Sequence, residues 1–188
     1  MHKLFLFILC LFFTLPVFAA ETYLIDPSHS SVLWHVNHFG FSNPSGKWMV
    51  GSGTLLLDET KPADSQVEVT IQVADIVTGI PKLDEHLKSK DFFDVATFPT
   101  AIFKSNKIDM IGKNKAKVHG ILTVHGISKP ITLAVTLNKI GVSPITGKKT
   151  VGFTATTQFK RSLLGINKYL PGLGDDVKID IEAEANLK

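Results

Sequence analysis

Cysteine is almost absent from this chain of 188 residues. Its single cysteine, Cys10, lies in an N-terminal apolar run. The run, Leu4 to Phe13, is ten residues long, whereas a helix needs about 20 to cross a bilayer. His2 and Lys3 precede it, and Val17-Phe18-Ala19 has the small–x–small pattern of a signal-peptidase site. The pattern predicts that residues 1–19 are a signal peptide and that the protein is exported to the periplasm.

Residues 20–188 contain no cysteine at all. This absence excludes disulfide bonds, thiol catalysis and metal–thiolate sites from the mature chain. A secreted protein without disulfides has to be held together by its hydrophobic core. The 169 residues that remain are enough to bury about 70% of the surface that the unfolded chain exposes.

An excess of charge of one sign is also missing, since 20 lysines and arginines face 17 aspartates and glutamates. Proteins that follow a nucleic-acid backbone need clustered positive charge, so we expect no nucleic-acid partner. Internal repeats, low-complexity tracts and linkers are absent as well. We therefore expect residues 20–188 to form one domain.

Alternation of apolar and polar residues is the dominant pattern that is present. Three segments alternate cleanly, Val67–Val73, Ile131–Leu137 and Val177–Ala183, and a period of two predicts β-strands with one apolar face. Turn-forming residues between the segments, such as those of Gly126–Pro130, favour antiparallel neighbours. Weaker alternation predicts five further strands, for a total of eight, at Ser30–Phe39, Lys47–Leu57, Thr100–Asp109, Lys115–His125 and Lys149–Lys160.

One segment reads differently. Pro81–Lys90 begins with proline, has acidic residues in its first turn and lysines in its last, which predicts a short helix. Gly165–Gly174 is expected to be a loop that leads into the last strand. The strands can pair as a solid two-sheet sandwich, close as a filled barrel, or close around one small ligand. Periodicity alone leaves all three arrangements open.

The segment Asp84–Val95, followed by Phe98-Pro99 and Phe103-Lys104-Ser105, resembles the central motif of the YceI-like family. These are exported lipocalin-like barrels that bind polyisoprenoids and related long-chain lipids. The resemblance implies an all-β fold, an eight-stranded antiparallel lipocalin-like barrel with one short helix between strands three and four. It extends over Tyr23–Ser30, Val118–Pro130, Gly152–Ala155 and Arg161–Ile166.

The resemblance also implies a function, namely binding, transport or storage of a long-chain amphiphilic lipid in the periplasm. The expected ligand is a polyisoprenoid or isoprenoid quinone, with a fatty acid or amide as close rivals. No other cofactor is expected, and no residue is assigned a catalytic role. The resemblance further allows a homodimer and a transient contact with a membrane or lipid donor.

Strand parity then predicts which side chains face the barrel interior. In the first predicted strand, Trp34 and its alternate neighbours share one face, and His35 lies on the other. Polar candidates for a lipid head group are His38, His86, Lys88, Asp91 and Ser105. The ligand-binding residues expected from parity and resemblance are Val32, Trp34, Val36, His38, Val69, Ile71, Leu87, Phe92, Phe103, Leu133, Val135, Phe153 and Ile179.

Two other functions remain open at this stage. The six histidines of the mature chain suggest a metal-binding or hydrolytic enzyme, but His35 and His38 lie three apart on a strand and so point to opposite faces. Asp26, Ser28 and His29 suggest a nucleophilic triad, although neighbours on an extended chain diverge. We expect no metal ligands. A solid sandwich acting as a stress or adhesion module is the third alternative.

Overall fold

The computed structural model describes residues 20–188, and the predicted signal peptide lies outside them. These residues form ten strand segments in one antiparallel sheet that closes on itself through a pairing of β1 with β10. The strands are β1 (Glu21–Ile25), β2 (Ser31–His38), β3 (Ser45–Met49), β4 (Ser52–Leu57), β5 (Gln66–Gln72), β6 (Thr100–Met110), β7 (Lys115–Val124), β8 (Ile127–Val142), β9 (Lys149–Lys160) and β10 (Leu173–Leu187). The helical elements are η1 (Pro62–Asp64), η2 (Val73–Asp75), α1 (Pro81–Lys88) and η3 (Arg161–Leu164).

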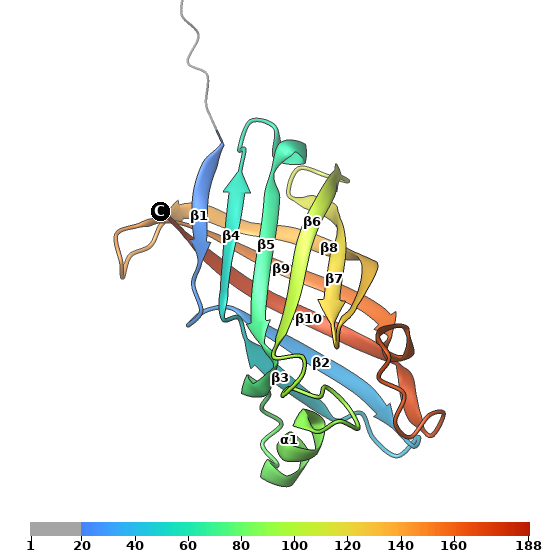
Figure 1. Ribbon diagram of the computed structural model, residues 1–188. Coiled ribbons are helices and arrows are strands. Elements are labelled where there is room, and N and C mark those ends of the chain that lie inside the picture. The colour runs from blue at the N-terminus through green and yellow to red at the C-terminus, as the bar shows by residue number, and fades with distance from the viewer. Residues whose placement is uncertain (1–19) are drawn as a thin grey trace, which may run out of the picture.

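The ten segments make an eight-stranded barrel because two of its strands are each broken in two. β1 and β2 lie end to end along β10, and β4 and β3 pair with them in the same order. The remaining strands follow around the wall in chain order (Figure 1). The predicted fold class, a closed antiparallel barrel, is therefore confirmed.

Both breaks lie at the same level of the wall. Between β1 and β2, the buried hydroxyl of Ser30 bonds the backbone of Glu184 in β10. Between β3 and β4, the N–H of Val50 donates to the carbonyl of Ser30. The N–H of Gly51 donates to the carbonyl of Thr70. These bonds pair backbone groups of both strands at the point where they bend.

The structure corrects several predicted boundaries. Glu21–Ile25 was not predicted as a strand, but it supplies the pairing that closes the barrel. The predicted turn Gly126–Pro130 is mostly strand, because the chain reverses at His125 and Gly126 through left-handed backbone conformations. Pro130 is tolerated in β8 because this part of the strand pairs only with β7, so one edge is free of ladder bonds.

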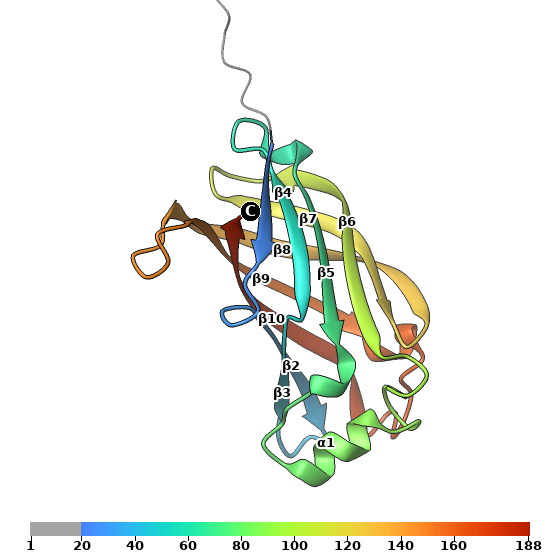
Figure 2. The ribbon, with the colours of Figure 1, turned by 60° about the vertical axis from the view of Figure 1, so that its left-hand side comes forward.

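The predicted short helix is present as α1, at the end of the barrel where β5 finishes (Figure 2). Pro81 is at its first turn, and the Asp84 carboxylate accepts hydrogen bonds from the backbone and hydroxyl of Thr78. These contacts fix the direction in which the chain enters the helix. No helix within residues 20–188 is long and apolar enough to span a bilayer.

Candidate functional site

A cavity of about 880 Å³ runs along the inside of the barrel. It is lined at the α1 end by residues such as Ile80 and Tyr169, and at the opposite end by residues such as Met110 and Asn114. β6 runs between these ends, and its 11 residues span roughly 35 Å at the usual strand rise. The volume lies near the upper end of the range for small-molecule sites, about 300–1,000 Å³. The closed barrel therefore encloses space for an elongated ligand.

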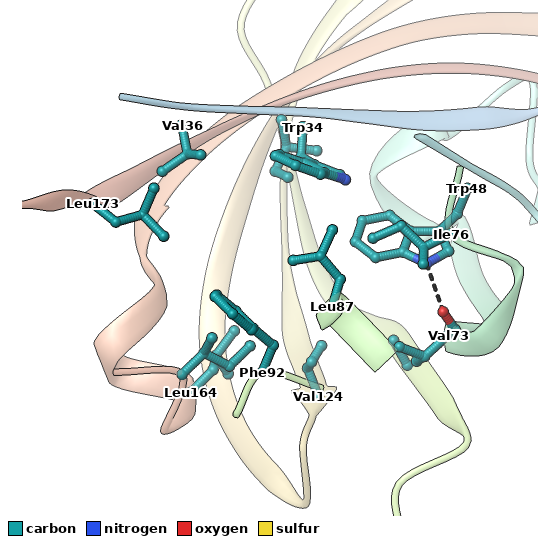
Figure 3. Packing of buried hydrophobic residues seen from close by; sticks show 13 residues of the cluster. Trp34, Val36, Trp48, Val73, Ile76, Leu87, Phe92, Val124, Leu164 and Leu173 are labelled. Atoms are coloured by element: carbon teal, nitrogen blue, oxygen red, sulfur yellow. Dashed lines mark hydrogen bonds between the residues drawn. The ribbon is translucent and has the colours of Figure 1, made fainter. Parts of the chain in front are cut away.

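Every one of the thirteen side chains predicted to contact a ligand lines this cavity. Figure 3 labels four of them, Trp34, Val36, Leu87 and Phe92, which pack together with their neighbours at the α1 end. Eleven of them lie on strands that are regular enough for alternate residues to share a face, whereas Leu87 lies in α1 and Phe92 follows it. Their contact with a ligand stays a prediction.

Of the five polar candidates, His38 and His86 line the cavity, and Lys88, Asp91 and Ser105 do not. Ser105 is buried in the wall, and its hydroxyl accepts a hydrogen bond from the backbone N–H of Val67. The register of β6 and β7 shifts between Ser105 and Lys107, so a β-bulge interrupts the alternation there. The hydroxyl thus pairs a backbone N–H of β5 within the wall.

The loop between β9 and β10 supplies lining residues that parity could not predict, among them Leu164, Ile166 and Tyr169. Arg161 holds this loop in place. It is buried, and its guanidinium donates to the carbonyls of four residues, which are Gly174, Ile166, Lys168 and Leu173. Burial lowers the pKa of Arg161, and the nearby Asp175 carboxylate opposes that effect. The guanidinium is therefore committed to the loop backbone.

Aromatic side chains and an ion pair pack together at the α1 end. The Phe92 ring lies edge-on to His86, with ring centroids 5.0 Å apart, and 6.3 Å from Tyr169. The Lys168 ammonium lies 3.0 Å from Asp91, and this hydrogen bond holds the pKa of Asp91 below its usual value. The ion pair thus joins the segment after α1 to the β9–β10 loop at this end of the cavity.

The opposite end of the cavity is more polar. Its lining includes Glu59, Lys113 and Lys115. Lys149 lies 2.7 Å from Glu59 and also pairs with Glu21. These carboxylates raise the pKa of Lys149 far above its usual value, with Glu21 the larger cause. Charged groups are therefore concentrated at this rim, while the interior is almost wholly apolar.

The suspected triad is not assembled. His29 Nδ1 lies 2.9 Å from Asp26 Oδ2, and the backbone N–H of Ser28 donates to the other oxygen of the same carboxylate. The Ser28 hydroxyl is not in this network. The three residues form the turn between β1 and β2, where the aspartate orders the backbone.

This turn gives the stability a small pH dependence. The hydrogen bond to Asp26 raises the pKa of His29 above its ordinary 6.5, so the protonated form stabilises the fold below pH 6.5 and loses its effect as pH rises through the raised pKa. We expect His29→Gln to lower Tm slightly at about pH 5 and to leave it unchanged at about pH 9, because the pair is exposed. Thermal melts of both proteins at the two pH values check this. An equal Tm difference at both would contradict it.

A longer hydrogen-bonded chain crosses the outer face. His119 bonds Asp109 through Nε2 at 3.0 Å and the Thr132 hydroxyl through Nδ1 at 2.9 Å. Lys107 pairs with the same Asp109 carboxylate, and its hydrogen bond is the main cause that lowers the pKa of Asp109. The chain lies beside a shallow pocket of about 320 Å³. Within residues 20–188 no group of three or more histidine or acidic side chains is arranged to hold a metal ion.

Comparison with known proteins gives one consistent result. The family model described as the YceI-like domain matches residues 23–185. A UPF0312 protein of Pseudomonas fluorescens (strain SBW25) is 35% identical over 167 residues, which are 88% of this chain and 86% of that protein.

Solved structures agree with this match. Burkholderia cenocepacia BcnA superposes with a TM-score of 0.77 at 26% identity, covering 85% of this chain and 98% of that one. A polyisoprenoid-binding domain from Saccharophagus degradans, implicated in plant cell wall breakdown, has a TM-score of 0.67 at 11% identity and covers 90% and 99% of the two chains. At that identity the second likeness concerns the fold alone. With the family model matching nearly all of the described residues, the chain belongs to the YceI-like family.

Proposed function

We propose that the protein binds a long-chain amphiphilic lipid inside the barrel, to carry or store it in the periplasm, and that it is not an enzyme. The observation that carries the proposal is the cavity of about 880 Å³, which is lined almost entirely by apolar side chains. The expected ligand is a polyisoprenoid or isoprenoid quinone, with a fatty acid or amide as rivals. The solved relative that is described as polyisoprenoid-binding supports this choice.

The energetics of such a site depend on length. Each methylene group removed from water contributes about 0.8 kcal/mol, although ligands of drug size retain only about 0.3 kcal/mol per heavy atom after the costs of binding. A long chain therefore reaches useful affinity by burial alone. Neither a metal ion nor a catalytic group is needed for this function.

Organic extraction of the native protein followed by mass spectrometry tests the proposal. We expect a hydrophobic compound bound at close to one molecule per chain. The refolded protein should take up the same compound again. A native protein that carries no lipid and takes up none from a mixed lipid extract would contradict the proposal and favour the solid-core alternative.

The shape of the cavity should select the ligand. The ring of Phe103 lies directly on the backbone of Gly120, because a Cβ added there would be 2.5 Å from its Cζ atom. Phe103→Leu opens space in the cavity, so we expect the bound lipids to shift toward bulkier or longer chains by about 1 kcal/mol, roughly fivefold. Mass spectrometry of the bound species measures the shift.

His35→Ala is the control for this change. His35 lies on the outer face of β2, where its Nε2 is 3.4 Å from Asp180. We expect its lipid profile to match that of the unchanged protein. A profile that His35→Ala alters and Phe103→Leu does not would show that the assignment of inner and outer faces has no bearing on the ligand.

A further inference from the structure

The two tryptophans of the chain, Trp34 in β2 and Trp48 in β3, both line the cavity at its α1 end. Their ring centroids are 6.5 Å apart and the rings are tilted by 47°. Each side chain is more than nine-tenths buried. The two indole N–H groups therefore lie in the same buried, apolar environment.

The two N–H groups differ in their partners. Trp48 Nε1 donates to the carbonyl of Val73 at 3.0 Å (Figure 3). Trp34 Nε1 is buried and has no acceptor among residues 20–188. Nearly all buried donors in proteins are paired, and an unpaired one costs about 1–3 kcal/mol. The indole N–H of Trp34 thus lacks an acceptor that the described residues 20–188 could supply.

The surrounding wall is built to hold an indole at this position. Trp34 pairs with Gly46 across β2 and β3, and a Cβ at Gly46 would lie 2.6 Å from the Trp34 ring and 2.8 Å from its nitrogen. Only glycine lets the ring lie flat against β3. The labelled side chains of the same cluster in Figure 3, including Val36 and Leu87, are apolar and offer no acceptor.

We propose that the indole N–H of Trp34 donates a hydrogen bond to an oxygen of the bound lipid. The inference rests on the proposed function and narrows its ligand to a neutral head group, such as an amide, a quinone or ketone carbonyl, or an alcohol. The oxygen then lies inside the cavity near the α1 end, with the hydrocarbon chain extending toward the opposite end.

A neutral head group follows from the lack of available positive charge. An anion buried against a single indole N–H would be desolvated without a counterion, which is strongly unfavourable. The buried cation nearby, Arg161, already donates to four backbone carbonyls. Lys168, at the rim of this end, is paired with Asp91. Neither of these two cations is therefore free to pair with a phosphate or carboxylate head group.

Three probes of equal chain length test the inference: octadecanamide, octadecanoate and octadecene. We expect the unchanged protein to bind the amide about three- to tenfold more tightly than the alkene, the range of one neutral hydrogen bond, and more tightly than the acid anion. Trp34→Phe removes the N–H and keeps an aromatic ring, so the amide and the alkene should then bind with nearly equal Kd. Titrations followed by competition with a fluorescent lipid give the ratios.

A second measurement uses the unchanged protein. Its two indole ¹⁵N–¹H resonances are assigned by the loss of one in Trp34→Phe or of the other in Trp48→Phe. The amide should move the Trp34 resonance downfield and the alkene should not. The Trp48 resonance should stay in place with both probes, because its N–H is already bonded to Val73.

The outcomes separate the two proposals. Equal binding of amide and alkene by the unchanged protein, tightest binding of octadecanoate, or an amide preference that survives Trp34→Phe would overturn the role of Trp34 and leave lipid binding intact. A Trp34 resonance that no probe moves but that Trp48→Phe shifts would assign the N–H to the face of the Trp48 ring and overturn it as well. If none of the three probes binds, the proposed function fails and this inference fails with it.

Discussion

Arg161→Met is expected to destabilise the protein by about 4 kcal/mol and to abolish lipid retention. Arg161 is 5% exposed and donates to four carbonyls, two in the loop that links β9 to β10 and two at the start of β10. Methionine fills much of the same volume but leaves those carbonyls without donors, and each buried unsatisfied polar group costs about 1–3 kcal/mol. For a chain of this size the loss corresponds to a fall in Tm of about 10 °C.

Retention should fail together with stability, because the loop carries part of the cavity wall. Leu164, Ile166 and Leu173 are buried in the same cluster as Trp34 and Leu87. A loop released from Arg161 would expose this end of the cavity to water. Thermal melts and quantification of the bound lipid measure the two effects.

Two further variants show whether the hydrogen-bond pattern or the charge matters. Arg161→Lys keeps the charge but lacks the planar fork that reaches several carbonyls at once, so it should recover less than half of the loss. Lys160→Met removes the neighbouring exposed charge, which pairs with Asp176 at 3.3 Å, and should change Tm by no more than about 2 °C. Full recovery in Arg161→Lys would refute the hydrogen-bonding role assigned to the guanidinium.

Regular strands explain why so much of the cavity could be predicted from sequence. In β8, Leu133 and Val135 alternate with threonine and alanine, and their facing follows once the face with the larger apolar residues is assigned to the interior. The same reasoning holds for Val69 in β5 and Ile179 in β10. All of them line the cavity.

Prediction failed where the alternation is interrupted or where the chain leaves the sheet. Ser105 precedes a bulge, which period counting cannot detect. The Arg161 contacts depend on how a loop folds back across the barrel end, and such contacts are long-range and have no periodic signal. The unpaired N–H of Trp34 could be found only after every neighbour was placed, since a sequence does not show which donors lack acceptors.

The segments β1 and β10 illustrate a further limit. Glu21–Ile25 does not alternate strongly, yet its pairing with the end of β10 closes the barrel. Closure depends on pairing between the two ends of the chain, a property of the whole sheet. Periodicity therefore allowed both a sandwich and a barrel, and the registers of β1 and β10 decide between them.

The variant Ala155→Phe should distinguish an open cavity from a filled core inside the barrel. Ala155 is in the middle of β9, where it pairs with Val135 of β8 and Ile181 of β10, and it lines the cavity. A phenylalanine here projects into the interior, so it occupies the space of the lipid chain. We expect binding of long-chain lipids to weaken by about tenfold or more, while shorter chains of the same class bind almost as before.

Stability decides between the two interpretations, because they predict opposite results for Ala155→Phe. In a packed core the larger ring would be overpacked and cost about 1–3 kcal/mol, whereas a cavity accepts it, and the ligand-free protein keeps or gains stability through the added apolar burial. Thr156→Phe, one residue along and on the exposed outer face, is the matched control and should leave the lipid profile unchanged. Melting of lipid-stripped protein, measured together with chain-length selectivity, gives both quantities. A fall in Tm with an unchanged lipid profile would mean that the interior near β9 is filled by protein, and the ligand would then have to lie elsewhere.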